Sequence, residues 1–263
     1  MISLHLLLCI LLCVAPCGLA EEWKPLGQAD HQEISPELSY AKRTAIRSSD
    51  GRQVSAHLAW FTSRSFRLKV VDLGGGAEPA YPTIGGAFRA GGCLAGVNGG
   101  FFHPDRRPAG LVIAQGRRIN RLETARLLSG VIYSDGEGIH LMRRGRFQDH
   151  PGIDALLQGG PYLVEDARAV RGLSASDPNR RTFIATDWRG RWAIGTTLGP
   201  LSLADLAECL ASPGALVPWR VDRALNLDGG TSSGFYFAGQ AGHAPVSLAP
   251  LKSVSNLLGI APR

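Results

Sequence analysis

The sequence predicts an α+β fold: one domain with a mainly antiparallel or mixed sheet, few helices and glycine-rich loops at the strand ends. Short runs rich in Val, Ile, Phe and Tyr follow one another along residues 54–260, punctuated by Gly, Pro and Asp, which is typical of strands separated by turns. The chain also contains 33 glycines, which suits many tight connections better than long helices. No repeat, linker or domain boundary interrupts residues 51–263.

The strand runs suggest two hairpins and leave room for few helices. Asp135-Gly136 separates "GVIYS" from "GIHLM", and Arg189-Gly190 separates "FIATD" from "RWAIG", so each pair is expected to form a β-hairpin. The clear helix begins after Ser202, a good N-cap, and repeats apolar residues at helical spacing until Pro213-Gly214. A second, short helix is expected around Pro82 to Ala90.

The N-terminal residues resemble an export signal. Residues 1–20 are apolar and uncharged, and Gly18-Leu19-Ala20 offers small residues where a signal peptidase cuts, so cleavage is expected after Ala20. Cys17 as an acylated lipoprotein residue is a less favoured alternative. The expected location is secreted or periplasmic, with no transmembrane anchor after cleavage. Residues 21–50 are polar and are expected to form an irregular approach segment to a domain over 51–263.

Two cysteines, Cys93 and Cys209, remain after removal of residues 1–20. An even pair in an exported protein could form a disulfide. Two separate buried thiols are an equally good interpretation.

The formal charge of +6 comes mainly from arginines, which bind phosphates and carboxylates through a bidentate fork. These basic residues are scattered along the chain and are not collected on one helix with interleaved aromatic residues, so nucleic acid is not an expected partner. A phosphorylated or otherwise anionic glycan suits an exported protein better. The oligomeric state stays open.

The segment "LNLDGGTSSGFYF" contains a match to the serine-hydrolase pattern G-x-S-x-G. That motif needs a helix after the serine and an acid and a histidine downstream, whereas "FYFAGQ" looks like a strand and no Asp or Glu follows. A serine triad is therefore not expected. The sequence identifies no cofactor, and it leaves open a divalent cation held by carboxylates such as Asp228 and Asp187.

Three glycine pairs follow strand-like runs, and each has a polar residue beside it. They are Asn98-Gly99-Gly100, Gln158-Gly159-Gly160 and Asp228-Gly229-Gly230. Paired glycines let the backbone turn sharply and expose N–H donors to an anion, so the three pairs are expected to share a pocket. Ordinary strand-end turns are the alternative. Arg180 and Arg181 open another strand and are candidates for holding a phosphate.

These segments, in this order, resemble the phosphodiester glycosidase family. The resemblance rests on "GVNGGFF", "QGGPYLV", "RRTFIATD", "LSLADLAECL" and "LNLDGGTSSGF", and it covers about Leu58 to the C-terminus. It implies a pocket built from Asn98, Gly99, Gly100, Gln158, Gly159, Arg181, Asp228, Gly229 and Gly230. Two positions depart from the family pattern: Thr231 replaces a third glycine, and Lys252 replaces an arginine.

The expected function is therefore hydrolysis of a sugar-1-phosphodiester. Asp228 is expected to act as base or nucleophile, and Arg181 to neutralise the leaving phosphate together with Arg180 and backbone N–H groups. Asn98 and Gln158 are expected to contact sugar hydroxyls, with Thr231 influencing specificity. The alternatives are a non-catalytic glycan-binding module and a metal-dependent phosphodiesterase that cleaves P–O.

Overall fold

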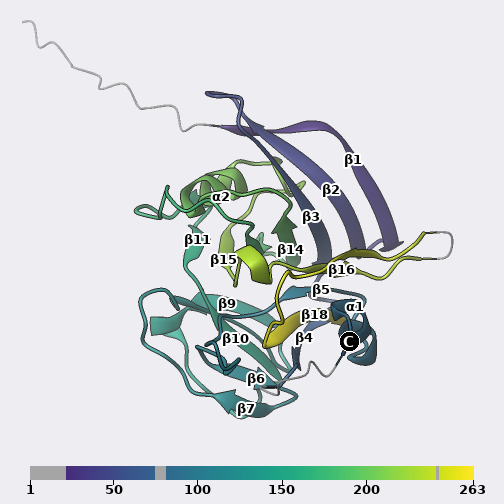
Figure 1. The fold of residues 1–263 in the computed structure, drawn as a ribbon, viewed down its shortest axis with the longest axis vertical. Helices are drawn as coiled ribbons and strands as arrows, with labels where there is room; N and C mark the ends of the chain where they lie inside the picture. Colours follow the sequence, from purple (N-terminus) through teal and green to yellow (C-terminus); the bar gives the residue numbers. More distant parts are fainter. Residues whose placement is uncertain (1–21, 75–80, 241–242) are drawn as a thin grey trace, which may run out of the picture.

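Antiparallel sheets form most of the computed structural model, which describes residues 22–74, 81–240 and 243–263 (Figure 1). The predicted signal peptide lies outside these residues. The described chain folds into three sheets and only two α-helices, which confirms the predicted α+β class with few helices. Within these ranges, no helix combines the length and the apolar character needed to cross a bilayer.

The largest sheet has eight strands, ordered β1-β2-β3-β14-β13-β15-β11-β12. Its strands are β1 (Trp23–Ser35), β2 (Leu38–Arg47), β3 (Gln53–Thr62), β11 (Tyr162–Glu165), β12 (Arg168–Ala169), β13 (Thr182–Thr186), β14 (Arg191–Thr197) and β15 (Arg223–Asn226). The predicted hairpin at Arg189-Gly190 is confirmed, because β13 pairs with β14.

The two smaller sheets have five strands each. One follows the order β7-β6-β10-β8-β9 and consists of β6 (Val112–Ala114), β7 (Arg117–Asn120), β8 (Gly130–Ser134), β9 (Ile139–Arg143) and β10 (Ala155–Gly159). The other follows β17-β16-β5-β18-β4 and consists of β4 (Phe66–Asp72), β5 (Ala95–Asn98), β16 (Phe235–Phe237), β17 (Val246–Leu248) and β18 (Asn256–Pro262). The predicted hairpin at Asp135-Gly136 is confirmed by the pairing of β8 with β9.

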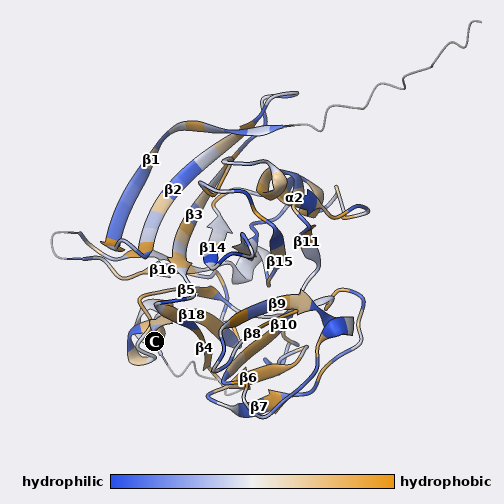
Figure 2. Ribbon diagram, turned by 180° about the vertical axis from the view of Figure 1, so that it is seen from behind, coloured by the Kyte–Doolittle hydropathy of each residue, from blue (hydrophilic) through white to orange (hydrophobic). Residues whose placement is uncertain are grey.

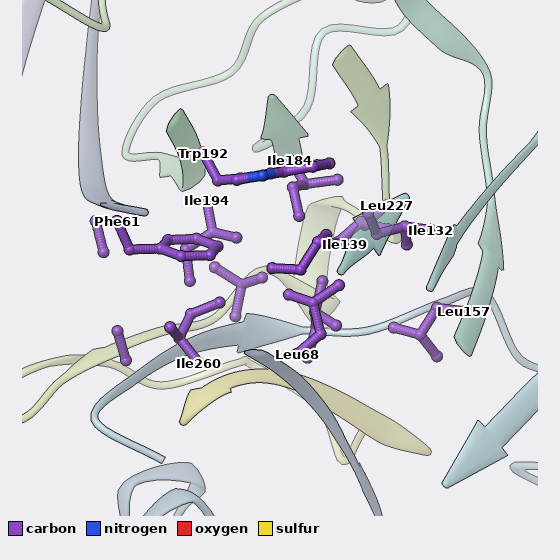
Figure 3. Packing of buried hydrophobic residues seen from close by; sticks show 14 of the residues in the cluster. Phe61, Leu68, Ile132, Ile139, Leu157, Ile184, Trp192, Ile194, Leu227 and Ile260 are labelled. Carbon is purple, nitrogen blue, oxygen red and sulfur yellow. The ribbon is translucent and has the colours of Figure 1, made fainter. Parts of the chain in front are cut away.

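One apolar cluster lies between the three sheets and holds them together. Ile184 and Ile194 come from the large sheet, Ile132 and Leu157 from the β6–β10 sheet, and Leu68 and Ile260 from the β4–β18 sheet (Figure 3). Each such fully buried aliphatic side chain contributes about 1.5–3 kcal/mol relative to an exposed one. Leu227 belongs to this cluster and immediately precedes Asp228, so the core fixes the chain where the candidate site begins.

Both expected helices form. Helix α2 (Leu203–Ala211) begins at Ser202, whose hydroxyl accepts from the Asp205 N–H, and it covers the outer face of the large sheet. Helix α1 (Ile84–Ala90) packs Phe88 against β5, where a side chain at Gly96 would lie 2.1 Å from the Phe88 ring. Two 3-10 turns complete the described elements: η1 (Arg144–Arg146) and η2 (Gly230–Ser232).

Residues 21–50 were expected to be irregular, and this expectation is wrong. They contain β1 and β2, which pair with each other and extend the large sheet through β3. Most of β1 is exposed and hydrophilic (Figure 2), so its sequence lacks the apolar run that marks a buried strand. Backbone pairing across the sheet, rather than side-chain burial, fixes its conformation.

Cys93 and Cys209 do not form a disulfide. Both are free and buried, Cys93 beside α1 and Cys209 within α2, in separate apolar clusters. Burial raises the pKa of the Cys93 thiol to about 11 and also raises the pKa of Cys209. The interpretation as two separate buried thiols is the one that the structure bears out.

Candidate functional site

The segments after β5 and β15 are joined at the candidate site. Asn98 ends β5, and its Nδ2 donates to the carbonyl oxygen of Asp228 at 2.6 Å. The Asp228 N–H donates in turn to the carbonyl oxygen of Gly99 at 3.1 Å. Two hydrogen bonds therefore hold the backbone of Asp228, which fixes the position from which its carboxyl group projects.

The glycines of this junction are required by close backbone packing. A Cβ at Gly99 would lie 2.0 Å from Asn256 Oδ1, and one at Gly229 would lie 2.7 Å from the carbonyl oxygen of Arg180. Gly230 has a φ of +63°, in the left-handed region that favours glycine. Any larger residue at Gly99 or Gly229 would push these segments apart.

The second glycine pair, Gly159-Gly160, lies against the other two. A Cβ at Gly100 would lie 3.1 Å from the carbonyl oxygen of Gln158, and one at Gly159 would lie 3.1 Å from the carbonyl oxygen of Asn226, at the end of β15. The structure thus brings the three glycine pairs together, although they lie far apart in the sequence.

The N–H groups of the first and third pairs already have acceptors within the protein. Gly99 and Gly100 donate to Asn256, through its carbonyl oxygen and its Oδ1 respectively, each at 2.9 Å. Gly229 donates to Asp228 Oδ1 at 2.9 Å, and Gly230 donates to the carbonyl oxygen of Arg180 at 2.7 Å. The anion-binding role of these donors stays a prediction, since a phosphate would have to compete with these partners.

The amide of Asn98 is held by three protein partners. Its Oδ1 accepts from Thr182 Oγ1 at 2.7 Å and from the Gly234 N–H at 3.0 Å, while its Nδ2 holds Asp228. The side chain is also 1% exposed. Asn98 therefore links β5, β13 and the Asp228 segment in this structure.

The amide of Gln158 is saturated within the protein. Its Oε1 accepts from the N–H groups of Leu111 and Glu123, both at 2.9 Å. Its Nε2 donates to the carbonyl oxygens of Glu123 at 2.7 Å and Leu128 at 3.1 Å. Gln158 therefore anchors the loop that contains Glu123.

Asp228 carries a half-buried carboxyl group with an altered proton affinity. Burial raises its pKa, because the charged form loses hydration. The Ser232 hydroxyl, the positive charge of Lys252 and the Gly229 N–H oppose part of this rise. A carboxyl group with a raised pKa beside a cation is suited to proton transfer or nucleophilic attack at a bound substrate.

The two adjacent arginines differ in how they are engaged. Arg181 donates from Nε to the carbonyl oxygen of Leu201 at 2.7 Å and from Nη2 to that of Asp177 at 2.6 Å. Arg180 Nη2 is buried and has no hydrogen-bond partner among the described residues. Arg180 thus has a guanidinium donor without a protein partner, whereas Arg181 donates to two backbone carbonyls.

Asn256 and Thr182 were not identified from the sequence as residues of the site, and Lys252 was noted there only as a departure from the family pattern. Asn256 and Thr182 hold Gly100 and Asn98 through their side chains, and Lys252 lies with its Nζ 4.8 Å from the centroid of the Phe102 ring. A polar residue inside the apolar run "VSNLLGI" was the available signal for Asn256. Thr231, predicted to influence specificity, is exposed at the site, and its carbonyl oxygen accepts from the Leu251 N–H at 2.8 Å.

The remaining candidate chemistries can be placed as well. Ser232 lies in the turn η2, and strand β16 follows it, so no nucleophile elbow forms. Asp187 accepts from the N–H groups of Arg189 and Arg191 and stabilises the β13–β14 hairpin. In the described ranges, no group of three or more His, Cys, Asp or Glu side chains is placed to hold a metal ion.

A family model described as phosphodiester glycosidase matches residues 91–261. The chain belongs to this family. The matched segment contains every residue of the site discussed above, from Asn98 to Asn256. A comparison with curated proteins finds no match.

Solved structures share the fold of this phosphodiester glycosidase domain. The catalytic domain of zebrafish N-acetylglucosamine-1-phosphodiester alpha-N-acetylglucosaminidase, auto-inhibited by its pro-peptide, matches with a TM-score of 0.66 and 18% identity over 92% of this chain and 89% of that one. A hypothetical protein from Synechocystis matches with a TM-score of 0.61 and 16% identity, over 90% of this chain and 64% of that one. A Burkholderia pseudomallei protein, named as a putative exported protein, matches with a TM-score of 0.54 and 15% identity over 81% of this chain and 75% of that one.

Proposed function

We propose that this protein hydrolyses a sugar-1-phosphodiester by cleaving the bond between the anomeric carbon and the phosphate oxygen. The observation that carries the proposal is Asp228: a half-buried carboxyl group with a raised pKa, its backbone fixed by Asn98 and Gly99, beside the charge of Lys252. Membership of the phosphodiester glycosidase family supports this reaction class. The name of the zebrafish neighbour, which acts on a sugar phosphodiester, is consistent with it.

The proposed mechanism needs one carboxylate. Asp228 acts as the base that activates water or as the nucleophile at the anomeric carbon. The phosphate monoester that departs is a stable anion and needs little protonation, unlike the alcohol that leaves in ordinary glycoside hydrolysis. Lys252 and Arg180 are the cations that we assign to the developing negative charge.

The other predicted site residues then have positioning roles. Arg181 fixes the start of β13 through the Leu201 and Asp177 carbonyls. Asn98 and Gln158 hold backbone segments in place, because every donor and acceptor of the Gln158 amide is used within the protein and the buried Asn98 amide has three protein partners. We further propose that the substrate is a phosphorylated glycan of the cell envelope or its surroundings, in line with the signal-like residues 1–20.

Hydrolysis in oxygen-18 water tests the proposal. The purified protein is incubated with glycosyl-1-phosphate methyl esters of several sugars, and the products are analysed by mass spectrometry. C–O cleavage places oxygen-18 in the sugar, and Asp228→Asn is expected to lower kcat at least about 1,000-fold, because neither base nor nucleophile remains. Asp149→Asn, which removes an exposed carboxylate paired with Arg118, is the matched control and is expected to retain full activity.

Three results would contradict the proposal. Label in the phosphate, with loss of rate on adding a chelator, would indicate a metal-dependent phosphodiesterase. Binding of the esters without any product would indicate a glycan-binding module. Near-native turnover by Asp228→Asn would remove this carboxyl group from the mechanism.

A further inference from the structure

A cavity of about 390 Å³ lies beside the candidate site and is not used by the proposed mechanism. The loop after β5 and the segment after β7 provide most of its walls, and the end of β4 and Ser255 close it. Its lining includes four basic or potentially basic residues: His103, Arg106, Arg107 and Arg121. Such a concentration of guanidinium groups is suited to a phosphate or carboxylate ligand.

Most charges around the cavity are already paired. Arg107 pairs with Asp105 at 2.7 Å, and Arg121 pairs with Glu123 at 2.8 Å. Asp72, the other acid in the lining, pairs with Arg117 at 3.1 Å. The carboxylates of the wall therefore already have arginine partners, and none of these pairs involves Arg106.

Arg106 is the unpaired charge. Among the described residues its guanidinium has no ion pair or hydrogen bond, and its Nη2 is shielded from solvent. Leaving a buried donor of a charged group without an acceptor is unfavourable, so native proteins normally satisfy it. Arg106 as a whole is partly exposed and lines the cavity, so an anionic ligand there would give its guanidinium group the partner that it lacks.

The backbone of the loop is strained at the same residue. Arg106 has a φ of +64°, in the left-handed region that residues other than glycine rarely adopt. Two hydrogen bonds hold this turn: Arg106 N–H donates to the His103 carbonyl oxygen at 2.8 Å, and His103 N–H donates to that of Arg107 at 2.9 Å. Backbone strain that is enforced by the surrounding structure is common at ligand sites. Here it occurs at the residue whose side chain lines the cavity, Arg106.

The cavity and the candidate site share walls. Ser255 lines the cavity and precedes Asn256, whose Oδ1 accepts from the Gly100 N–H. His103 also lines the cavity and follows Phe102, whose ring is in contact with Lys252. A substrate bound at Asp228 could therefore extend into the cavity.

We propose that this cavity is a subsite for a second anionic group of the substrate, with Arg106 as its principal ligand. The substrate class is then a glycan that carries a phosphate or carboxylate near the scissile phosphodiester, rather than an isolated neutral sugar ester. This inference rests on the proposed function for the identity of the substrate, whereas the anion site itself does not depend on it.

A pair of substrates tests the subsite. Both carry the same sugar-1-phosphodiester, and one has a further phosphate on its leaving group. Arg106→Gln is expected to raise KM about tenfold for the doubly charged substrate, because a charge-assisted contact is lost, and to change KM less than twofold for the singly charged one. Arg106→Lys keeps the charge without the bidentate fork and is expected to give an intermediate KM.

Arg118→Gln is the matched control. It removes the same charge from an exposed arginine that pairs with Asp149 and lies outside the cavity lining. It is expected to leave both KM values within twofold of the native ones. Equal effects of Arg106→Gln on both substrates, or no effect on either, would overturn the proposal.

Ligand titration separates this proposal from the proposed function. Inorganic phosphate and glucuronate are titrated calorimetrically into Asp228→Asn and into the same protein with Arg106→Gln added, after thermal melts show that both are folded. Loss of at least tenfold in affinity for one of these anions identifies the ligand as phosphate or carboxylate. If no sugar phosphodiester is turned over but this loss is seen, the hydrolase proposal fails and the subsite stands. If affinity for both anions is unchanged, the subsite fails whatever the activity.

Discussion

At the scale of single residues, the site has one reactive group, the Asp228 carboxyl group, and its surroundings are fixed by hydrogen bonds within the protein. Asp228 has an altered pKa and partial exposure, whereas the buried amides of Asn98 and Gln158 are engaged by several protein partners each. These hydrogen bonds make the position of the carboxyl group insensitive to side-chain motion, which favours a defined geometry for reaction. Of the three polar residues next to glycine pairs, Asp228 thus supplies the reactive group, and Asn98 and Gln158 hold the backbone around it.

The raised pKa of Asp228 makes a prediction about stability. Between the ordinary pKa of the unfolded carboxyl group, about 3.9, and the raised folded value, the native state binds more protons than the unfolded state. Stability contributed by this group is therefore fully present below the ordinary pKa and is lost as pH rises through that window. Asp228→Asn should then be more stable than the native protein at pH 7.

Urea unfolding at pH 7 and at pH 3.5 checks this expectation. The gain in free energy of unfolding for Asp228→Asn should shrink at the lower pH, where the native carboxyl group is protonated as well. Asp149→Asn serves again as control, since its carboxylate is exposed. A variant less stable than the native protein at pH 7 would show that the ionised Asp228 is favourably solvated.

The sequence could indicate the acid and the glycines of this site, but not the hydrogen bonds around them. The acid and the glycines could be recognised, because a strand followed by Asp-Gly-Gly has a local pattern. The hydrogen bonds of the Asn98 and Gln158 amides join residues that are 30 to 136 positions apart in the sequence, so no local pattern indicates them. Which of Arg180 and Arg181 is available for a phosphate also depends on the direction of each side chain, and only the folded structure gives that direction.

At the scale of elements, the strands with apolar runs were predictable and the exposed ones were not. Strands β8 and β13 read as buried runs, whereas β1 has one fully buried residue, Trp23, at its first position. Because β1 and β2 form their long hairpin through backbone pairing, hydrophobic periodicity carries little signal there. The helix α2 was predictable because its cap and its apolar spacing agree.

The connection between β2 and β3 is joined to α2 by a cluster of charged side chains, and this link can be tested. Asp205, in the first turn of α2, accepts from Ser202 at 2.8 Å, from Arg47 at 2.6 Å and from Arg52 at 2.5 Å. Replacing it by Asn leaves Arg47, whose side chain is 12% exposed, with Asp50 as a remaining partner. The expected loss is therefore about 3 kcal/mol, at the lower end for a broken buried pair.

Guanidinium unfolding of Asp205→Asn measures this loss. Ser202→Ala removes the cap and its hydrogen bond to the Asp205 carboxylate, leaves both arginine contacts in place, and should lose only about 1 kcal/mol. The comparison separates capping from the link between the hairpin and the helix. Equal losses in the two variants would show that the arginines contribute nothing beyond the cap.

At the scale of the whole molecule, one core joins all three sheets and three smaller clusters lie outside it. The central core fixes Leu227 and thereby Asp228, while α1 and α2 close the outer faces. The fold does not need a covalent bridge between these regions, because each cysteine is packed within a cluster of its own.

The two thiols give the last prediction. Burial raises the pKa of Cys93 to about 11 and raises that of Cys209 as well, so both stay protonated and shielded at neutral pH. The chain without residues 1–20 should react with no equivalent of a thiol reagent when native and with two in denaturant, without any reductant. Its melting temperature should be the same with and without a reductant, because no loop is closed by a disulfide. Failure of the denatured chain to react until reductant is added would mean that Cys93 and Cys209 are bridged after all.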